Sequence, residues 1–516
     1  MHNGTAQQLY HKLEGQRWSY LDRGRQCSKL TIPYVMPDDG FSSHSRLNTP
    51  FQGVGARGVN NLASKLLLAL LPPNAPFFRL NIDKYKLQAE GSPDEVITGI
   101  ETALQQVEEA VMDEISRESY RVALHEALKH LIIVGNALVY LPDDGGMRVF
   151  HLDRYVVERD PMGNIIYIAT KETISYSALS EEMRSVVGAM GESPDDDLHL
   201  YTGVCREKDG WRVYQDINGE VIPSSRGFYA LDKNPFIPLR FSRVDGENYG
   251  RGYVEEYLGD LQSLETLTQA IVQGSAAAAK VLFLVNPNGT TRASTLAQSP
   301  NGAITQGNAA DVSVLQLNKF NDFRVAQETI NTIKDRLGHS FLLTSGVVRN
   351  AERVTAEEIR MLSQELETAL GGLYSLLSTE LQLPMVNRIM TVMNKKKKLP
   401  KLPKELINPV IITGVEALGR GNDLQKLDMF LAGAAQVVGP EATAQYVNVA
   451  EYFSRRATAL GIKTAGLIKT QEEIQAEQQQ AQQMQMMQSL GPSGIKAISD
   501  QQLQGQGPTV EQQQQQ

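Results

Sequence analysis

The sequence predicts an α+β fold that is mainly helical, and three observations support this prediction. Several long segments place apolar residues every three or four positions, which is the spacing of an amphipathic helix. A block between about residues 147 and 244 instead contains short strand-like runs separated by turn signals. Most of these runs follow one another without an intervening helix, which favours antiparallel pairing over an alternating βαβ sheet.

The composition is that of a protein with sizeable hydrophobic cores. The chain has 516 residues, of which 41% are hydrophobic, and this length leaves room for about two to four domains. Its two cysteines, Cys27 and Cys205, lie far apart, so we expect neither a disulfide framework nor a cysteine-bound metal, and a reducing compartment suits the chain. Because no apolar run is long enough to cross a membrane and the first residues lack a secretion signal, we expect a soluble, unsecreted protein.

The N-terminal part is predicted to be helical on both sides of a glycine-rich segment. Helical spacing runs from Thr5 to about Ser28, and Gly53, Gly55 and Gly58 then spell G-x-G-x-x-G. That pattern cradles a dinucleotide pyrophosphate only when a buried strand precedes it, whereas here a polar, turn-rich stretch does. We therefore predict a loop that leads into a packed helix.

A short strand and two more helices are predicted next. "APFFRLNID" at 75–83 is typical of a strand, and the helix after it opens with Ser92-Pro93-Asp94-Glu95, a capping box with proline in the first turn. A further helix is predicted to continue to Tyr140. The strand-like runs then follow at 147–152, 155–160, 164–174, 198–207, 210–217 and 235–244, with turns at 160–164 and at Asn218-Gly219.

The second half predicts a long helical hairpin with a small domain at its tip. One helix is expected from Tyr253 to about Val285, including an unusually small-sided stretch at 274–279. A Gly/Asn/Thr-rich region at 286–322 holds one short strand, "VSVLQL", and the returning helix starts at Phe323. After a connector at 339–353, a third long helix is expected to bend at Gly371-Gly372 and at Pro384.

Lysines and glutamines distinguish the C-terminal part. The run Lys395–Lys398, followed by Lys401 and Lys404, is spaced by prolines and is interpreted as an exposed linker at a domain boundary, with a phosphate-binding patch as the alternative. Further helical segments continue to about residue 470, and a glutamine-rich tail follows.

No motif in the sequence predicts catalysis, a cofactor or a metal site. His125 and His130 are five apart, which places them about 140° apart around a helix instead of on one face as in zinc proteases. A phosphate-binding P-loop and a G-x-S-x-G motif are absent, and the acidic run at 195–197 lacks the pattern of a calcium loop. An α+β enzyme with a helical regulatory domain remains an alternative, but it would need clustered acids and a metal.

Five long stretches resemble the portal, or head-to-tail connector, of short-tailed podoviruses of the autographivirus kind. They occur in the same order over about residues 5–430, and the glutamine tail and lysine run depart from the family pattern. The stretches are "GARGVNNLASKLLLALLP", "YRVALHEALKHLIIVGNALVYLP", "YVVERDPMGNI", "DGENYGRGYVEEYLGDLQSLETLTQAIV" and "ERVTAEEIRMLSQELETALGGLYSLLSTELQLP".

The resemblance implies a portal fold with an α+β wing, a helical-hairpin stem, a small α/β clip and a helical crown. The glycines at 53–58 are then expected in a wing loop. The expected boundaries are 1–255 for the wing, 256–285 and 323–340 for the two stem helices, 286–322 for the clip, 341–354 for the tunnel loop, 355–394 for the long wing helix, 395–470 for the crown and 471–516 for the glutamine-rich tail.

The same resemblance implies a non-catalytic structural protein without a cofactor. The expected assembly is a homo-oligomeric ring of twelve subunits at one capsid vertex of the virion, built in the host bacterial cytoplasm, through which double-stranded DNA is packaged and ejected. The implied partners are terminase, tail adaptor proteins, and the capsid, scaffolding and internal core proteins, with no membrane. A scaffold or tail-tube adaptor is the alternative structural role, and it would lack the stem hairpin.

The resemblance also implies which residues to test. The candidate tunnel-loop residues are Leu343, Thr344, Ser345, Arg349, Asn350 and Arg353. The candidate clip contacts are Asn288, Arg292 and Lys319. A formal net charge of −9 per chain argues against tight DNA binding through the overall field, and it suits a channel in which DNA slides past a few basic side chains such as Arg349 and Arg353.

Overall fold

The computed structural model describes residues 4–41, 44–73, 76–81, 94–187, 197–278, 282–315, 320–343, 356–370, 372–399, 410–413 and 420–439, together with positions 447, 449, 452, 453 and 456. The chain forms two compact units, Met1–Leu418 and Gly419–Gln516. The fold is α+β and mainly helical, as predicted. Over the described ranges, no helix combines the length and the apolar character needed to cross a bilayer.

The N-terminal helical segment is confirmed, with a short 3₁₀ turn dividing it. Helix α1 covers Ala6–Glu14 and α2 covers Trp18–Lys29. Thr5 and Gln8 form a reciprocal capping box: the Thr5 hydroxyl accepts the Gln8 N–H at 3.3 Å, and the Gln8 side chain accepts the Thr5 N–H at 3.4 Å. This cap starts α1 where its apolar face meets the large sheet.

Helix α3, Val54–Leu70, corrects the expected position of the glycine motif. Gly53 caps the helix, but Gly55 and Gly58 lie inside its first two turns and not in a loop. A Cβ at position 55 would come within 2.5 Å of the Leu30 carbonyl oxygen, so close approach of another chain segment explains this glycine. The described residues before Gly53, 44–52, contain no strand, so the dinucleotide alternative has no support.

Helices α5, Asp94–Arg117, and α6, Tyr120–Val134, follow the short strand β1, Phe78–Asn81. The prediction that the second helix reaches Tyr140 is wrong. Gly135 adopts a left-handed conformation with φ 83° and donates to the carbonyls of His130 and Leu131, which ends α6. The apolar run after it forms a buried central strand, β2, instead.

Two antiparallel sheets form the β-rich region, and all six predicted strands of the 147–244 block are present. In the smaller sheet β2 lies between β10 and β3, and in the larger one the order is β4-β5-β6-β7-β8 with β9 also on β7. The sequence pattern does not predict β2, β8 and β9. The bounds are β2 Asn136–Tyr140, β3 Arg148–Phe150, β4 Tyr155–Arg159, β5 Ile165–Ser175, α7 Glu181–Val187, β6 Asp197–Arg206, β7 Gly210–Ile217, β8 Glu220–Val221, β9 Gly227–Ala230 and β10 Phe236–Arg240.

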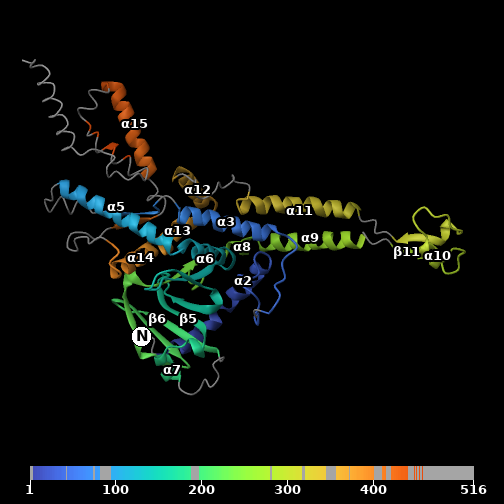
Figure 1. Cartoon of the computed structure of the whole chain (residues 1–516), viewed down its shortest axis with the longest axis horizontal. Helices are drawn as coiled ribbons and strands as arrows, with labels where there is room; N and C mark the ends of the chain where they lie inside the picture. The colour runs from blue at the N-terminus through green and yellow to red at the C-terminus, as the bar shows by residue number, and fades with distance from the viewer. Residues whose placement is uncertain are drawn as a thin grey trace, which may run out of the picture. The chain divides into compact units, whose positions relative to one another are not determined.

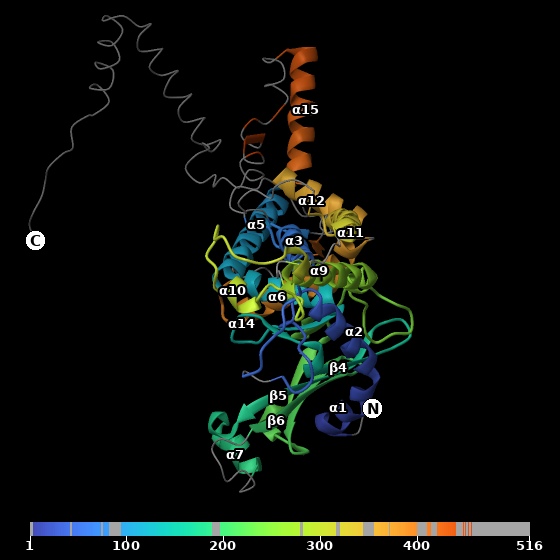
Figure 2. The same cartoon turned by 90° about the vertical axis from the view of Figure 1, so that its right-hand side faces the viewer.

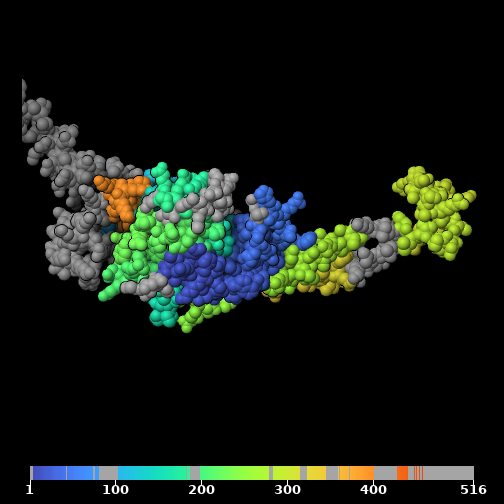
Figure 3. All heavy atoms as spheres, turned by 90° about the horizontal axis from the view of Figure 1, so that it is seen from below, coloured from blue at the N-terminus to red at the C-terminus, as the bar shows by residue number. Residues whose placement is uncertain are grey.

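Helix α1 covers one face of the larger sheet (Figure 2). Its Tyr10 and Leu13 are buried against Tyr167 of β5. Beside it the buried Arg17 donates to the carbonyls of Leu152, Asp153 and Tyr155 and to the Tyr10 hydroxyl. A charged side chain this deep is tolerated because several acceptors surround it. The N-terminal residues are visible at the surface of this region in Figure 3.

Helices α9, Leu258–Ala278, and α11, Phe320–Ser340, form the predicted hairpin and lie side by side (Figure 1). A short helix, α8 at Tyr253–Glu256, precedes it. The first hairpin helix is shorter than predicted, because "LFLV" forms strand β11, Leu282–Val285, paired with β12, Val312–Leu315. Phe283 and Val285 favour an extended strand, and pairing with β12 takes the place of further helix. Helix α10, Ala293–Gln298, lies between the two strands in sequence.

The third long helix is interrupted, as the glycine pair predicts. Its parts are α12 Ala356–Ala369, α13 Leu373–Leu377, a π-helical turn Ser378–Gln382 and α14 Leu383–Lys395. Gly372 has φ 89° before α13, and Pro384 lies in the first turn of α14.

The lysine run is not a free linker. Lys395 contacts Asp143 at 3.2 Å and Lys398 contacts Glu114 at 2.7 Å. These ion pairs fasten the end of α14 to the segment after β2 and to α5. Strand β13, Val410–Thr413, then pairs with β1 and also belongs to the first unit. The two compact units meet in sequence after Leu418.

The second unit is described for α15, Arg420–Val438, and a few residues after it. The Tyr452 hydroxyl donates to Asp428 at 2.6 Å, and Arg456 forms an ion pair with the same carboxylate at 3.0 Å. The glutamine-rich tail at 471–516 lies outside the described residues.

Gly135→Ala tests the switch from α6 to β2. A Cβ there would lie 2.5 Å from the Gly252 backbone nitrogen, and the left-handed backbone adds strain, so we expect a loss of at least about 2 kcal/mol of stability. Gly259→Ala is the matched control, because that exposed helical position has open space around it. Thermal unfolding followed by circular dichroism measures both, and equal melting temperatures would contradict the explanation.

Candidate functional site

The hairpin is anchored at one end and exposed at the other. Near its base, buried apolar residues from both helices join the main core: Leu261, Leu264, Ile330, Ile333 and Leu337. Farther along, Gly274 faces the Phe323 ring, and a Cβ there would lie 2.7 Å from Phe323 Cζ. This contact leaves no room for a side chain at position 274. Val272 and Val325 are exposed on the same part.

The base of the hairpin ends in an aromatic cluster around Phe341. The Phe341 ring is fully buried, with ring centroids 5.6 Å from Tyr253 and 5.8 Å from Tyr257. Gly58 of α3 lies against it, and a Cβ at position 58 would come 2.7 Å from Phe341 Cγ. The glycine is therefore required by the ring, and this contact joins α3 to the end of α11.

Three side chains hold the backbone that leaves the hairpin. Asn61 donates from Nδ2 to the carbonyls of Phe341, at 3.1 Å, and Leu342, at 3.0 Å. Lys65 Nζ donates to the Leu342 carbonyl at 3.2 Å, and burial lowers the pKa of Lys65 although the charge of Glu365 partly offsets this. The Tyr253 hydroxyl donates to the Ser340 carbonyl at 2.8 Å.

Leu342 occupies the left-handed region at φ 53°, which ends α11. The Leu343 N–H donates to the Gly338 carbonyl at 2.8 Å and completes a helix-terminating motif. A leucine in this conformation costs about 1–2 kcal/mol relative to a right-handed one. Because Asn61 and Lys65 bind the carbonyls around it and Phe341 is buried beside it, these contacts hold Leu342 in this turn.

Asp311 organises the tip between β11 and β12. Its carboxylate accepts hydrogen bonds from the Thr290 hydroxyl and from both the N–H and the hydroxyl of Thr291. The Thr291 backbone N–H is the main cause of a lowered pKa for Asp311. Gly289 leaves room for this carboxylate, since a Cβ there would lie 2.6 Å from Asp311 Oδ1. The tip therefore has its own polar centre.

The tip exposes two large apolar side chains of β11. Phe283 is 61% exposed and Leu284 is 51% exposed. Asn288 and Arg292 are also exposed, and within the described part of the chain the Arg292 guanidinium makes no hydrogen bond or ion pair. Exposed aromatic and aliphatic side chains and an exposed arginine are typical of protein contact surfaces.

Comparisons with known proteins identify the family. The model of the bacteriophage head to tail connecting proteins matches residues 3–468. The chain belongs to this family. The portal protein of Escherichia phage T7 is 41% identical over 491 residues, covering 93% of this chain and 91% of the T7 protein. The portal protein of Enterobacteria phage T3 is 42% identical over 480 residues, covering 91% and 89%, and that of Enterobacteria phage SP6 is 31% identical over 500 residues, covering 95% of each.

Membership makes the chain a phage portal, a structural and non-enzymatic component of the virion at its portal vertex. The resemblance to podovirus connectors is thereby confirmed. The virion of a gene transfer agent contains a chain with a TM-score of 0.36 at 10% identity, covering 80% of this chain and 90% of that one, a likeness too weak to add to the assignment.

The structure describes three of the nine candidate portal residues. Leu343 lies at the end of the anchored hairpin, and Asn288 and Arg292 are on the exposed tip. Those outside the described residues are Thr344, Ser345, Arg349, Asn350, Arg353 and Lys319.

The residues that hold the backbone at the end of the hairpin were not predicted from the sequence. Asn61 and Lys65 were not singled out, and Gly58 was assigned to a loop. The sequence did contain a signal for Lys65, because this residue adjoins the apolar stripe of α3 between Leu62 and Ala69. In the structure Lys65 is 2% exposed. A lysine that close to a buried stripe indicates a cation held by specific acceptors.

Gly58→Ala tests the contact that joins α3 to the end of α11. The added methyl group overlaps Phe341 near its backbone end, where the ring cannot move away cheaply, so we expect a loss of about 1–3 kcal/mol of stability. Gly53→Ser in the same motif is the control, because its side chain points into open space at the cap of α3. Chemical denaturation measures both.

A double variant separates this contact from a general effect on α3. Phe341→Ala removes Cγ and the ring, which include the atom nearest to the added methyl group, so Gly58→Ala should cost less in that background than in the wild type. Equal costs in both backgrounds would contradict the proposed contact.

Proposed function

We propose that this portal assembles into a closed ring, with twelve subunits as the expected number, in which the α9–α11 hairpins surround a channel for double-stranded DNA. The observation that carries the proposal is the anchored hairpin itself, with its base buried in the core and its outer part exposed. Exposed Val272 and Val325 on this part would be covered by neighbouring hairpins in a ring. Family membership supports the same architecture.

The charge of the hairpin suits a channel that DNA passes through without being held. Helix α9 carries two acidic and no basic residues, and α11 carries three of each. Twelve chains at −9 each give a formal charge of −108. Because duplex DNA carries about one negative charge per 1.7 Å of its axis, a strongly basic channel would trap it, whereas this surface lets it slide.

The tunnel loop would supply the local contacts that the hairpin lacks. Arg349 and Arg353 repeat by symmetry around the ring, and their positive charges would meet the phosphates of a centred duplex. Asn61 and Lys65 fix the chain just before this loop, so its starting point would be the same in every subunit. The loop residues Thr344, Ser345 and Asn350 would add uncharged polar contacts to the DNA backbone.

Removing both loop arginines should release packaged DNA without preventing assembly. Arg349→Ala plus Arg353→Ala weakens the phosphate contacts, so particles should retain less genome than the wild type, measured as nuclease-protected DNA after packaging. Arg226→Ala plus Lys233→Ala removes the same charge from two exposed positions of the β-rich region and should leave retention unchanged. Wild-type retention by the loop variant would rule out this role.

Packaging energy must come from another protein, since the sequence has no P-loop. The exposed tip at β11 and β12 would bind the terminase motor and later a tail adaptor, with Asn288, Arg292 and Lys319 as contacts. Capsid, scaffolding and internal core proteins would bind elsewhere on the ring during assembly in the host bacterial cytoplasm. Exposed Phe283 and Leu284 support a protein interface at the tip.

Reversing the charge of Arg292 should weaken terminase binding. Arg292→Glu replaces an exposed, unpaired guanidinium on every subunit, and we expect at least about tenfold lower affinity for terminase with normal assembly. Surface plasmon resonance measures it, with Lys233→Glu as the charge-matched control. An affinity unchanged by Arg292→Glu would contradict a clip interface at this residue.

A further inference from the structure

Three potential metal ligands meet between α6 and the chain segment after β3. Glu126 and His130 are four residues apart on α6 and therefore lie on the same face of the helix. His151 follows β3 and approaches both, so that one donor atom from each residue lies within 4.8 Å of the other two. The His130 and His151 ring centroids are 4.3 Å apart.

The buried imidazole of this cluster lacks a partner. His130 is 2% exposed, and its Nδ1 is buried without a hydrogen bond in the structure. Buried polar atoms are rarely left in this state, because the loss of their hydration is not compensated. The contact between Glu126 Oε1 and His151 Nε2, at 3.6 Å, gives His130 Nδ1 no hydrogen-bond partner.

We propose that Glu126, His130 and His151 form a binding site for a divalent transition-metal ion, with Zn²⁺ as the best fit. Two imidazoles and one carboxylate are a common zinc donor set that leaves a fourth position open. Glu126 Oε1 and His151 Nε2 are 3.6 Å apart, close to the roughly 3.3 Å that separates two donors on a tetrahedral ion with bonds of about 2.0 Å. Small side-chain movements would complete the coordination.

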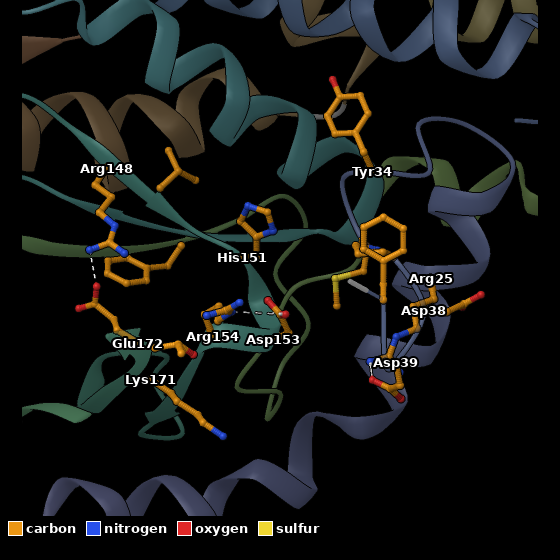
Figure 4. Close-up of a pocket in the computed structure, with 17 residues that line it drawn as sticks. Arg25, Tyr34, Asp38, Asp39, Arg148, His151, Asp153, Arg154, Lys171 and Glu172 are labelled. Carbon is orange, nitrogen blue, oxygen red and sulfur yellow. Dashed lines mark hydrogen bonds and ion pairs between the residues drawn. The ribbon is translucent and has the colours of Figure 1, made fainter. Parts of the chain in front are cut away.

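The surroundings allow an ion to enter. His151 borders a cavity of about 450 Å³ that is also lined by Arg148, Asp153 and Arg154 (Figure 4). The side chains of His151 and Glu126 are 37% and 54% exposed, so water can occupy the fourth position.

A bound ion would fasten the core helix α6 to the start of the large sheet. The segment just after His151 supplies the carbonyls of Leu152 and Asp153 that accept hydrogen bonds from the buried Arg17. Metal binding would therefore stabilise the junction of the N-terminal helices, α6 and the sheet. The sequence analysis predicted no metal because it compared His125 with His130, whereas the pair on one face is Glu126 with His130, and His151 comes from another element.

Zinc titration of the full-length assembled protein, after treatment with EDTA, tests the site. Isothermal titration calorimetry should show about one Zn²⁺ bound per chain, and zinc should raise the melting temperature. Glu126→Gln and His151→Gln, at partly exposed positions that tolerate replacement, should each weaken zinc binding at least tenfold and abolish the rise in melting temperature. His125→Gln, on the same helix but outside the cluster, is the control and should behave as the wild type.

Cobalt absorption provides a second measurement, and it would be absent if Glu126, His130 and His151 served only to pack α6 against the chain after β3. Co²⁺ bound by these ligands should show visible absorption typical of a tetrahedral site, and this signal should be lost in His151→Gln. Absence of stoichiometric zinc binding by the wild type, or equal binding by Glu126→Gln, His151→Gln and the wild type, would overturn the proposal. Neither result would affect the portal assignment, which does not depend on a metal.

Discussion

The contact between Gly58 and Phe341 is the constraint on which the proposed channel depends. A side chain at position 58 would occupy the space of the Phe341 ring, so the absence of one lets the end of α11 pack directly on α3. Asn61 and Lys65 then reach the carbonyls beyond the ring and hold Leu342 in a left-handed turn. The base of the hairpin is thereby tied to α3, and the backbone is held in place up to Leu342.

Buried polar groups connect the helices to the sheets over long sequence distances. Arg17 joins the N-terminal helices to the segment at 152–155, and Arg388 of α14 donates to the Leu141 carbonyl and pairs with Asp143 after β2. A buried arginine is costly unless hydrogen-bond acceptors lie around it. These arginines therefore favour the observed arrangement of helices and strands over alternative arrangements that would bury as much apolar surface but leave the arginines without acceptors.

Periodicity predicted most elements of this fold, because helices and half-buried strands have distinct apolar spacings. It failed where tertiary contacts decide, as at β2, where Gly135 ends α6, and at β11, where pairing with β12 stops the first hairpin helix. The two sites of interest could not be predicted from the sequence. The Gly58–Phe341 contact and the Glu126–His130–His151 cluster each join elements that are separate in sequence, and no spacing rule links them. The family assignment came instead from long matching strings.

Cryo-electron microscopy of the purified full-length protein tests the central claim most directly. The account predicts closed rings in which the α9–α11 hairpins surround a channel wide enough for a DNA duplex, with Phe341 of every subunit packed on Gly58 and the following chain directed toward the channel. Rings with the hairpins on the outer surface, or with the chain after Leu343 directed away from the channel, would contradict it.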